Sequence, residues 1–277
     1  MKALFVAVAI FVSVQSGAQY YYKDIIGTKE SAELITSYRN NNVRTVALNS
    51  YTVNNTPIDN FLIRQEYISG QQALRTITKT EYTQPSYLTS FIDANGRVVK
   101  TTDSADGMIN TTTYQYNANG NLTAVLFTAG DTLTAVKTDD HLWFYDNQNK
   151  VQKMLRIKNK RDTAVVSFKL DDKGNVIEEQ ERRRALTEEP YYYYYDNTNR
   201  LTDIVRFSKK ANRLLPEYMF EYSDKNQVIQ RITVPQNSSD YLIWRYAFND
   251  KGLKTKEVIF NKGKEQTGKV EYIYTFQ

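Results

Sequence analysis

The stretch Tyr193-Tyr194-Tyr195-Asp196-Asn197-Thr198-Asn199-Arg200-Leu201 (YYYDNTNRL) contains the pattern that decides the fold of this 277-residue chain. Aromatic side chains alternate before the aspartate, as in a strand with one buried face. Asp196 then begins a tight turn, because its side chain can accept a hydrogen bond from the backbone two residues on. Asn199 stands where the backbone must be left-handed, a conformation that Asn and Gly tolerate best. The stretch therefore predicts a β-hairpin with a bulge.

Seven copies of this turn organise the sequence. They begin at Asp93, Asn117, Asp146, Asp171, Asp196, Ser223 and Asn249, and their starts are separated by 24, 29, 25, 25, 27 and 26 residues. The left-handed places hold Gly96, Gly120, Asn149, Gly174, Asn199, Asn226 and Gly252. Since a strand flanks each turn on both sides, each unit is a hairpin. The predicted fold class is all-β: an antiparallel meander of repeated β-hairpins, about 25–27 residues per unit, forming a long twisted or curled sheet with one short N-terminal helix.

The chain divides into a leader, a cap and one repeat domain. Residues 43–277 are predicted to form a single β-hairpin repeat domain, with clear repeats over 85–277 and degenerate copies before them at runs such as VRTVAL and NFLIRQEYI. Residues 19–42 are predicted to form an N-terminal cap, in which Thr28 begins a short amphipathic helix that ends near Tyr38. Because the first unit of a repeat array exposes an apolar face, we expect the helix to cover that face.

Residues 1–18 (MKALFVAVAIFVSVQSGA) have the composition of a secretory signal peptide. One lysine precedes an apolar run, and Ser16-Gly17-Ala18 supplies the small residues of a cleavage site. We expect cleavage after Ala18, and the apolar run is too short to span a bilayer comfortably. The sequence therefore predicts an exported protein, periplasmic, at the cell surface or extracellular, that does not span the membrane after cleavage.

Composition and motifs argue against several function classes. The chain has no cysteine, which excludes disulfides and thiolate metal sites, and its net charge of +5 gives no footprint for nucleic acid. The single histidine, His141, continues the aromatic strand face and is interpreted as a packing residue. The carboxylate pairs Asp139-Asp140 and Asp171-Asp172 are attributed to turns. We therefore predict no catalytic residue, no cofactor, no metal site and no enzyme activity.

The recurring pattern, seen as YYYDNTNRL and as LWFYDNQNKV at residues 142–151, resembles the tyrosine–aspartate (YD) repeats of the Rhs type. It is most similar to their short exported relatives in Gram-negative bacteria, and the resemblance covers about residues 85–277. Such repeats imply a long β-sheet that can curl into a shell or a wound strip, with roles that run from toxin encapsulation to surface adhesion. The resemblance implies no particular site residues.

Together these features predict a non-enzymatic exported β-repeat protein, a structural or binding module of the cell envelope or cell surface whose partner is an unidentified envelope protein or glycan. The alternative is a glycan-binding module, because aromatic rings stack on sugars. Tyr192 and Tyr194 are the first candidates, because their places are mostly polar in the other copies. The candidate contacts are Tyr192, Tyr194, Phe144, Trp143 and Trp244. An outer-membrane β-barrel and a carboxylate-dependent hydrolase are lesser alternatives.

Overall fold

The computed structural model describes residues 20–277 except 131–135, 210, 236–237 and 239, so the predicted leader lies outside the described residues. One helix, α1 (Lys23–Asn40), precedes the strands, and a short 3-10 turn, η1 (Ser69–Gln71), joins two of them. The first strands are β1 (Val43–Tyr51), β2 (Phe61–Ile68), β3 (Ala73–Thr80), β4 (Ser86–Ile92), β5 (Val98–Ala105), β6 (Met108–Tyr116), β7 (Leu122–Gly130), β8 (Lys137–Tyr145) and β9 (Val151–Lys158). The remaining strands are β10 (Asp162–Leu170), β11 (Val176–Arg183), β12 (Leu186–Thr187), β13 (Tyr191–Tyr195), β14 (Leu201–Ser208), β15 (Arg213–Tyr222), β16 (Val228–Thr233), β17 (Leu242–Phe248), β18 (Lys254–Phe260) and β19 (Gln266–Phe276).

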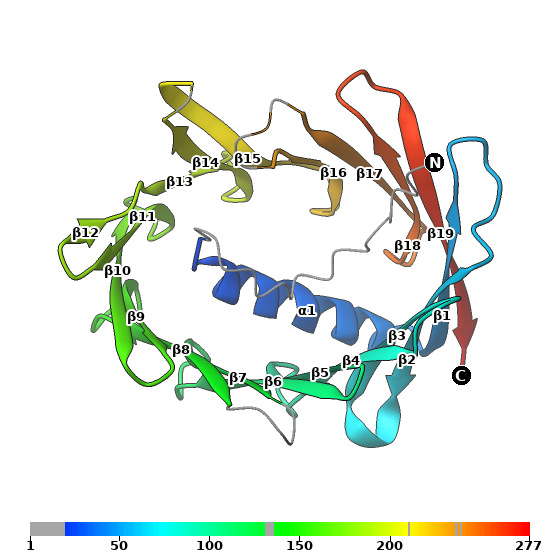
Figure 1. Ribbon diagram of the computed structural model, residues 1–277, viewed down its shortest axis with the longest axis horizontal. Coiled ribbons are helices and arrows are strands. Elements are labelled where there is room, and N and C mark those ends of the chain that lie inside the picture. The colour runs from blue at the N-terminus through cyan, green and yellow to red at the C-terminus, as the bar shows by residue number, and fades with distance from the viewer. Residues whose placement is uncertain (1–19, 131–135, 210, 236–237, 239) are drawn as a thin grey trace.

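The strands form one antiparallel sheet that closes on itself, which corrects the predicted long twisted or curled open sheet. β1 pairs with β19 from Val43 opposite Phe276 to Tyr51 opposite Lys269. The two-residue strand β12 branches from β11, which also pairs directly with β13, and the closed ring contains 18 strands. Figure 1 shows the ring seen end-on. Closure satisfies the backbone groups that an open sheet leaves unpaired at its two edges.

All seven predicted hairpin turns are confirmed. The seven left-handed places have φ between 61° and 88°. In the turn at Asp196, the Oδ1 atom accepts hydrogen bonds from the backbone N–H groups of Thr198 and Arg200, at 2.9 and 3.0 Å. The strand register shifts between Tyr194 and Tyr195, as a bulge requires.

An eighth turn of the same geometry begins at Asn261. Its backbone N–H donates to the carbonyl of Glu265, and Lys264 takes the left-handed place with φ of 61°. The sequence did not reveal this copy, because Lys264 stands where the other seven copies have Gly or Asn and Gly263 is one place early.

In four of the seven copies, a tyrosine directly before the turn joins the hairpin to the one before it. The hydroxyls of Tyr116, Tyr145, Tyr195 and Tyr222 donate to the carbonyls of Val98, Leu122, Val176 and Leu201, at 2.8, 2.8, 2.9 and 2.8 Å. Each accepting carbonyl belongs to the first strand residue after the preceding turn. The tyrosine rings therefore face the barrel interior while their hydroxyls satisfy backbone groups of the neighbouring unit.

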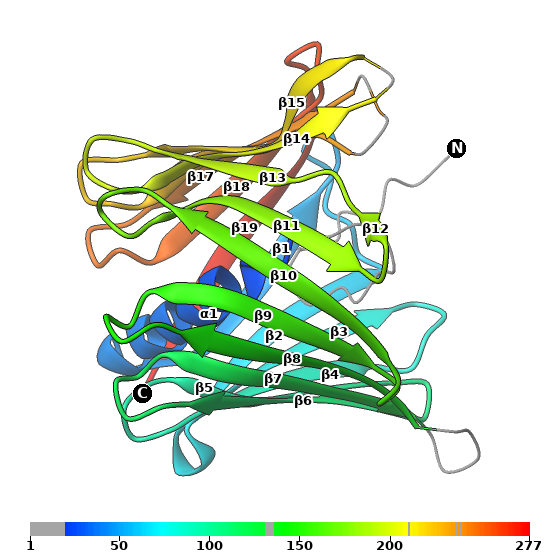
Figure 2. The same cartoon turned by 90° about the vertical axis from the view of Figure 1, so that its left-hand side faces the viewer.

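The helix differs from the prediction in length, start and place. It begins at Lys23, before Thr28, and the hydroxyl of Thr28 donates to the carbonyl of Asp24 at 2.7 Å instead of capping the N-terminus. The helix lies inside the ring, as Figures 1 and 2 show, and not over the end of a repeat array. Among the described residues, no helix is both long and apolar enough to cross a membrane.

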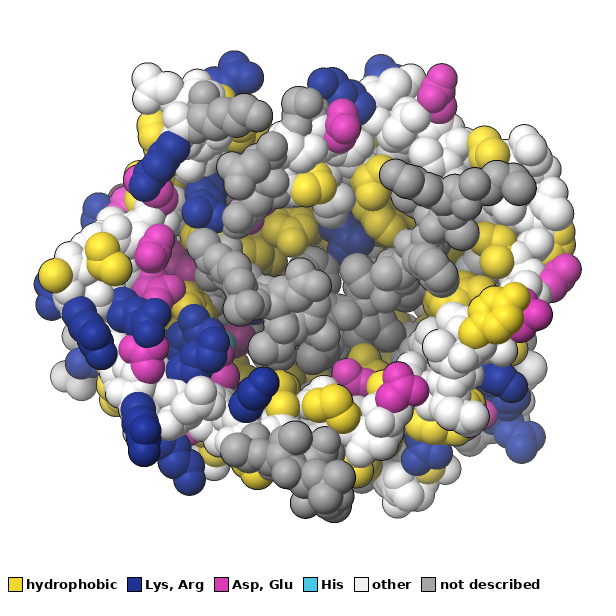
Figure 3. All heavy atoms as spheres, viewed as in Figure 1, with side chains coloured by type: hydrophobic (Ala, Val, Ile, Leu, Met, Phe, Trp, Pro, Cys, Tyr) yellow, Lys and Arg dark blue, Asp and Glu magenta, His cyan; other side chains and the backbone are white. Residues whose placement is uncertain are grey.

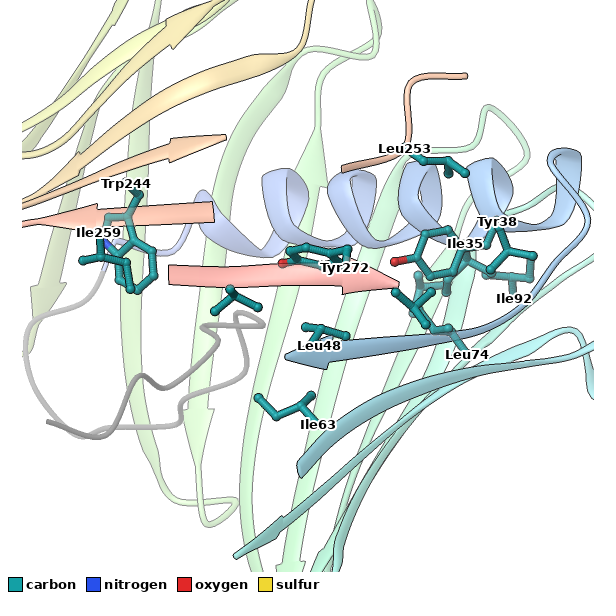
Figure 4. Close-up of a cluster of buried hydrophobic side chains, with 14 residues drawn as sticks. Ile35, Tyr38, Leu48, Ile63, Leu74, Ile92, Trp244, Leu253, Ile259 and Tyr272 are labelled. Atoms are coloured by element: carbon teal, nitrogen blue, oxygen red, sulfur yellow. The ribbon is translucent and has the colours of Figure 1, made fainter. Parts of the chain in front are cut away.

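Two clusters of buried side chains form the core, and each combines the ring wall with the N-terminal segment. In the first, Ile35 and Tyr38 of α1 pack with wall residues such as Leu74, Ile92 and Tyr272 (Figure 4). The second cluster contains Tyr20 and Tyr21 together with Trp143, Met154, Val166, Tyr191, Tyr193 and Ile204. The core therefore lies at the contact between the wall and the segment that the wall encloses.

We predict that Gly120→Ala destabilises the fold by about 1–2 kcal/mol, because φ of 83° is strained for a residue with a Cβ atom. No atom lies within 4 Å of the added Cβ, so the backbone conformation alone carries the effect. The matched control is Gly27→Ala in α1, which also meets no atom within 4 Å and should stabilise by about 0.5–1 kcal/mol. Urea unfolding measures both changes in stability. An equal effect of the two substitutions would contradict the left-handed backbone conformation of Gly120.

Candidate functional site

A buried group of charged side chains meets the first residues of α1 inside the barrel. We call Asp24, Asp139, His141, Arg156 and Glu179 the anchor cluster. Asp24 comes from the first turn of the helix, and the others come from β8, β9 and β11. Inward-facing strand positions place them around Tyr21 and Tyr22, the residues that lead into the helix.

His141 lies between two carboxylates. Its Nδ1 atom is 2.6 Å from Oδ2 of Asp24, and its Nε2 atom is 3.6 Å from Oδ1 of Asp139. The indole N–H of Trp143 also donates to Asp24, at 3.3 Å. Burial favours the neutral imidazole, but the charge of Asp24, its hydrogen bond to the ring and the nearby carboxylate of Asp139 outweigh burial and raise the pKa of His141 to about 9. The imidazolium is therefore an ion-pair partner of the helix at neutral pH.

Arg156 connects Asp139 to the chain just before the helix. Its guanidinium donates two hydrogen bonds to Asp139, with Nε 2.9 Å from Oδ1 and Nη2 2.6 Å from Oδ2, while Nη1 lies 3.0 Å from the hydroxyl of Tyr21. Burial opposes the charged form of Asp139, but the hydrogen bonds from Arg156 and His141 hold its pKa well below the usual range. This bidentate pair remains ionised and fixes the position of the Tyr21 ring.

Glu179 binds the backbone at the start of the helix. Its carboxylate accepts hydrogen bonds from the N–H groups of Tyr21 and Tyr22, at 2.6 and 2.8 Å, and from the hydroxyl of Tyr193 at 2.7 Å. The residue is 2% exposed, and burial raises the pKa of its carboxyl to about 7 against the lowering effect of these donors. A carboxylate from the wall thus satisfies amide groups that no side chain within the helix caps.

The chemistry of the anchor cluster is that of a structural anchor. Each of its five side chains contacts another member of the cluster or the segment around α1. Within the described residues, no group of three or more His, Asp or Glu side chains is arranged to hold a metal ion. The expectation that Asp139 belongs to a turn is wrong. Asp139 lies within β8, and its carboxylate forms an ion pair with Arg156.

A groove of about 1090 Å³ runs between α1 and one side of the wall. Its wall side is built from four successive hairpin turns, those between β4 and β5, β6 and β7, β8 and β9, and β10 and β11. Its helix side spans Tyr22 to Asn41. Figure 2 shows these turns at the same end of the barrel as the C-terminal half of α1.

The five predicted ligand contacts do not lie together. Trp143 and Trp244 face inward, at 3% and 7% exposure, and belong to the two core clusters. Phe144 and Tyr194 are exposed at 37% and 48% on the outer wall, where they stand on strands β8 and β13 with three strands of the ring between them. Tyr192 shares the outer face of β13 with Tyr194. A single aromatic platform made by all five side chains is therefore absent from the described structure.

Glu179 and the segment Tyr20–Tyr22 are not among the residues predicted from the sequence. Glu179 shares the inward face of the tyrosines because it pairs with Tyr191, and this register becomes visible only in the structure. The identity of its partner was not local information, since Tyr21 lies 158 residues away in the sequence.

Comparison with known proteins gives one family match. Residues 93–132 match the RHS repeat family. The predicted resemblance to Rhs-type repeats is confirmed for this segment. No curated protein sequence matches the chain.

Solved structures show distant likenesses. The chain is similar to part of the TcdB2-TccC3-Cdc42 crystal structure, at 15% identity and a TM-score of 0.36, and to part of the Tc holotoxin pore of Photorhabdus luminescens, at 14% and 0.35. Each match covers 75% of this chain and 11% of the other. A porin-like protein from Bacteroides uniformis matches at 12% identity and a TM-score of 0.42, over 85% of this chain and 97% of that one. At these values the likenesses identify no function.

We predict that Glu179→Gln destabilises the fold by about 1–3 kcal/mol, because an amide offers one acceptor atom to three buried donors. The control is Glu178→Gln, one residue away, whose carboxylate faces Lys169 on the outer wall at 2.8 Å. Breaking that exposed pair should cost about 0–1 kcal/mol. Chemical unfolding distinguishes them, and a smaller loss for Glu179→Gln than for Glu178→Gln would refute the anchoring role.

We predict that stability falls as pH rises from 6.5 to 9. The pKa of His141 is about 9 in the folded chain against 6.5 for an exposed histidine, so its contribution is complete below pH 6.5 and is lost through this window. The loss through His141 should amount to about 3 kcal/mol, and His141→Gln should remove the slope in the part of the window above the pKa of Glu179, which is about 7. Because the chain has one histidine, a single NMR imidazole resonance reports its titration directly. A midpoint near 6.5 in the folded protein would contradict the ion-paired arrangement.

Proposed function

We propose that this chain is a non-enzymatic, exported binding module of the cell envelope, in which a closed repeat barrel is a rigid scaffold around its own N-terminal helix. The anchor cluster carries the proposal. His141 and Glu179 direct their polar atoms to α1 and its approach, and Asp139 is paired with Arg156. None of the three side chains lines the groove.

The construction of the wall supports a scaffold role. Tyrosine hydroxyls bind the carbonyls of preceding units, and neighbouring turns are joined at their tips, where the amide of Asn119 donates to Asn149 at 2.6 Å and that of Asn175 to Asn199 at 2.6 Å. Such contacts hold the turns in fixed relative positions before any ligand arrives. The match to RHS repeats agrees with a structural or binding repeat module.

In the proposed function, the outer wall of the barrel faces water. Outward-facing strand residues include the ion pairs Lys169–Glu178 and Lys269–Glu271, at 2.8 and 2.9 Å, and an Arg64–Glu66 pair at 3.1 Å. Figure 3 shows basic and acidic side chains interspersed with small hydrophobic areas at one end of the barrel. Lipid-facing walls instead carry a continuous apolar band, so the three ion pairs on the strands of the outer wall weigh against the outer-membrane alternative.

The two remaining alternative functions, glycan binding by exposed aromatics and carboxylate-dependent hydrolysis, would each require specific residues. Glycan binding by exposed aromatics would rest on Tyr192, Tyr194 and Phe144, because the two tryptophans are buried. A carboxylate hydrolase would need a pair of free carboxylates, and Asp171 is held by its own turn through the N–H groups of Lys173 and Asn175. The binding-module proposal needs neither assumption.

We expect the purified protein to cosediment with envelope fractions of a Gram-negative bacterium and to leave their polymers intact. The full chain is expressed in a Gram-negative host, purified from the periplasm and checked by mass spectrometry for a mature N-terminus at Gln19. Bovine serum albumin is the control for trapping in the pellet. Release of soluble fragments from any fraction would overturn the non-enzymatic assignment. If the protein cosediments with none of the fractions, the binding assignment is overturned.

A further inference from the structure

We propose that the groove between α1 and the four hairpin turns binds an extended acidic polysaccharide, with about one disaccharide lying against each turn. The inference rests on the proposed binding function and names the ligand class and its place. It locates the ligand on the inner side of the ring, away from the outer aromatic residues Tyr192 and Tyr194.

The wall of the groove is periodic. Each of the four turns contributes residues from equivalent places, namely Asn95, Gly96 and Arg97; Gly120 and Asn121; Gln148, Asn149 and Lys150; and Lys173 and Gly174. Successive turns lie two strands apart, a distance of about 9.6 Å from the usual spacing of strands. An extended disaccharide unit spans a similar length, so a regular polymer can present the same group to each turn in succession.

The groove carries an excess of positive charge. Its lining includes the basic residues Lys29, Arg97, Lys150 and Lys173 and the single acidic residue Glu33. Arg97 is paired with the turn residue Asp93 at 2.6 Å, and Lys29 lies 4.0 Å from Glu33. Within the described part of the chain, Lys150 and Lys173 are in no ion pair. These two ammonium groups, on adjacent turns, are available to carboxylate groups of a ligand.

The rest of the lining suits sugar hydroxyl groups. Amide side chains of Asn95, Asn121 and Gln148 offer both donors and acceptors, and the helix adds the hydroxyls of Thr36 and Ser37. The rings of Tyr116 and Tyr145 also line the groove, and their hydroxyls are already bound to wall carbonyls. Fixed aromatic rings beside amides and hydroxyls are a surface on which pyranose rings stack and hydrogen-bond.

An acidic peptide fits this lining less well. The buried apolar residues of the groove, Leu122, Val151 and Val176, already belong to a core cluster. They therefore do not form open pockets for the apolar anchor side chains through which peptides gain affinity. A repeating anionic sugar uses the periodic polar groups without such anchors.

The test uses tetragalacturonate as an acidic probe and its fully methyl-esterified form as an uncharged probe with the same rings. We expect isothermal titration calorimetry to show binding of the acid that weakens with added salt, and at least about tenfold weaker binding of the ester. The double variant Lys150→Glu/Lys173→Glu should weaken binding of the acid by at least about tenfold. The matched control, Lys79→Glu/Lys153→Glu, makes the same charge change at exposed positions on the outer wall and should bind like the parent.

Each opposing outcome overturns the inference. Equal losses in the two double variants would indicate a general charge effect. Loss of binding in Tyr192→Ala/Tyr194→Ala would place the ligand on the outer wall. Equally tight binding of tetraglutamate would replace the glycan with a peptide. Envelope binding without binding of tetragalacturonate would refute the groove assignment and leave the proposed function standing. Circular dichroism verifies that each variant is folded.

Discussion

The fold depends on filling the space that its own closure creates. A ring of 18 strands is wider than its inward-facing side chains can fill, since barrels of about this strand number usually enclose a channel. Here α1 and the tyrosines before it occupy that space, and both core clusters are completed by them. The helix is therefore part of the core, and the wall and the helix need each other to bury their apolar faces.

Charge determines how the helix is held. Apolar packing is not directional, and it would allow a helix in a wide lumen to slide or rotate. Glu179 binds two backbone amides and His141 binds Asp24, so the N-terminal end has one position. The helix contacts β1, β2, β4 and β5, and the groove lies between the helix and the four turns from β4–β5 to β10–β11. The position of the helix, which the ionic contacts at its N-terminal end fix, therefore also sets the shape of the groove.

Local patterns predicted the local structure, and long-range pairing escaped them. The seven turns could be predicted because Asp, Asn and Gly have specific conformational roles at fixed offsets. The eighth turn could not, because its left-handed place holds Lys264, a residue type that is unfavourable there. Closure depends on β1 meeting β19 across more than 200 residues, and nothing in either strand encodes the identity of its partner. The helix could be recognised but not located. The candidate site was missed for the same reason, since Glu179, His141 and Tyr21 come from distant elements.

The antiparallel contact between β1 and β19 restricts how such a chain can change in length. Neighbouring strands alternate in direction around the ring, so the ring closes with antiparallel pairing only if its strand number is even. Loss or gain of one strand would make the first and last strands parallel at the seam, the pair through which the ring closes. Duplication of a whole hairpin preserves the seam, and its tyrosine hydroxyl finds the carbonyl of the unit before it. The repeat is therefore also the smallest step by which the circumference of this barrel, and the number of turns along its groove, can grow or shrink.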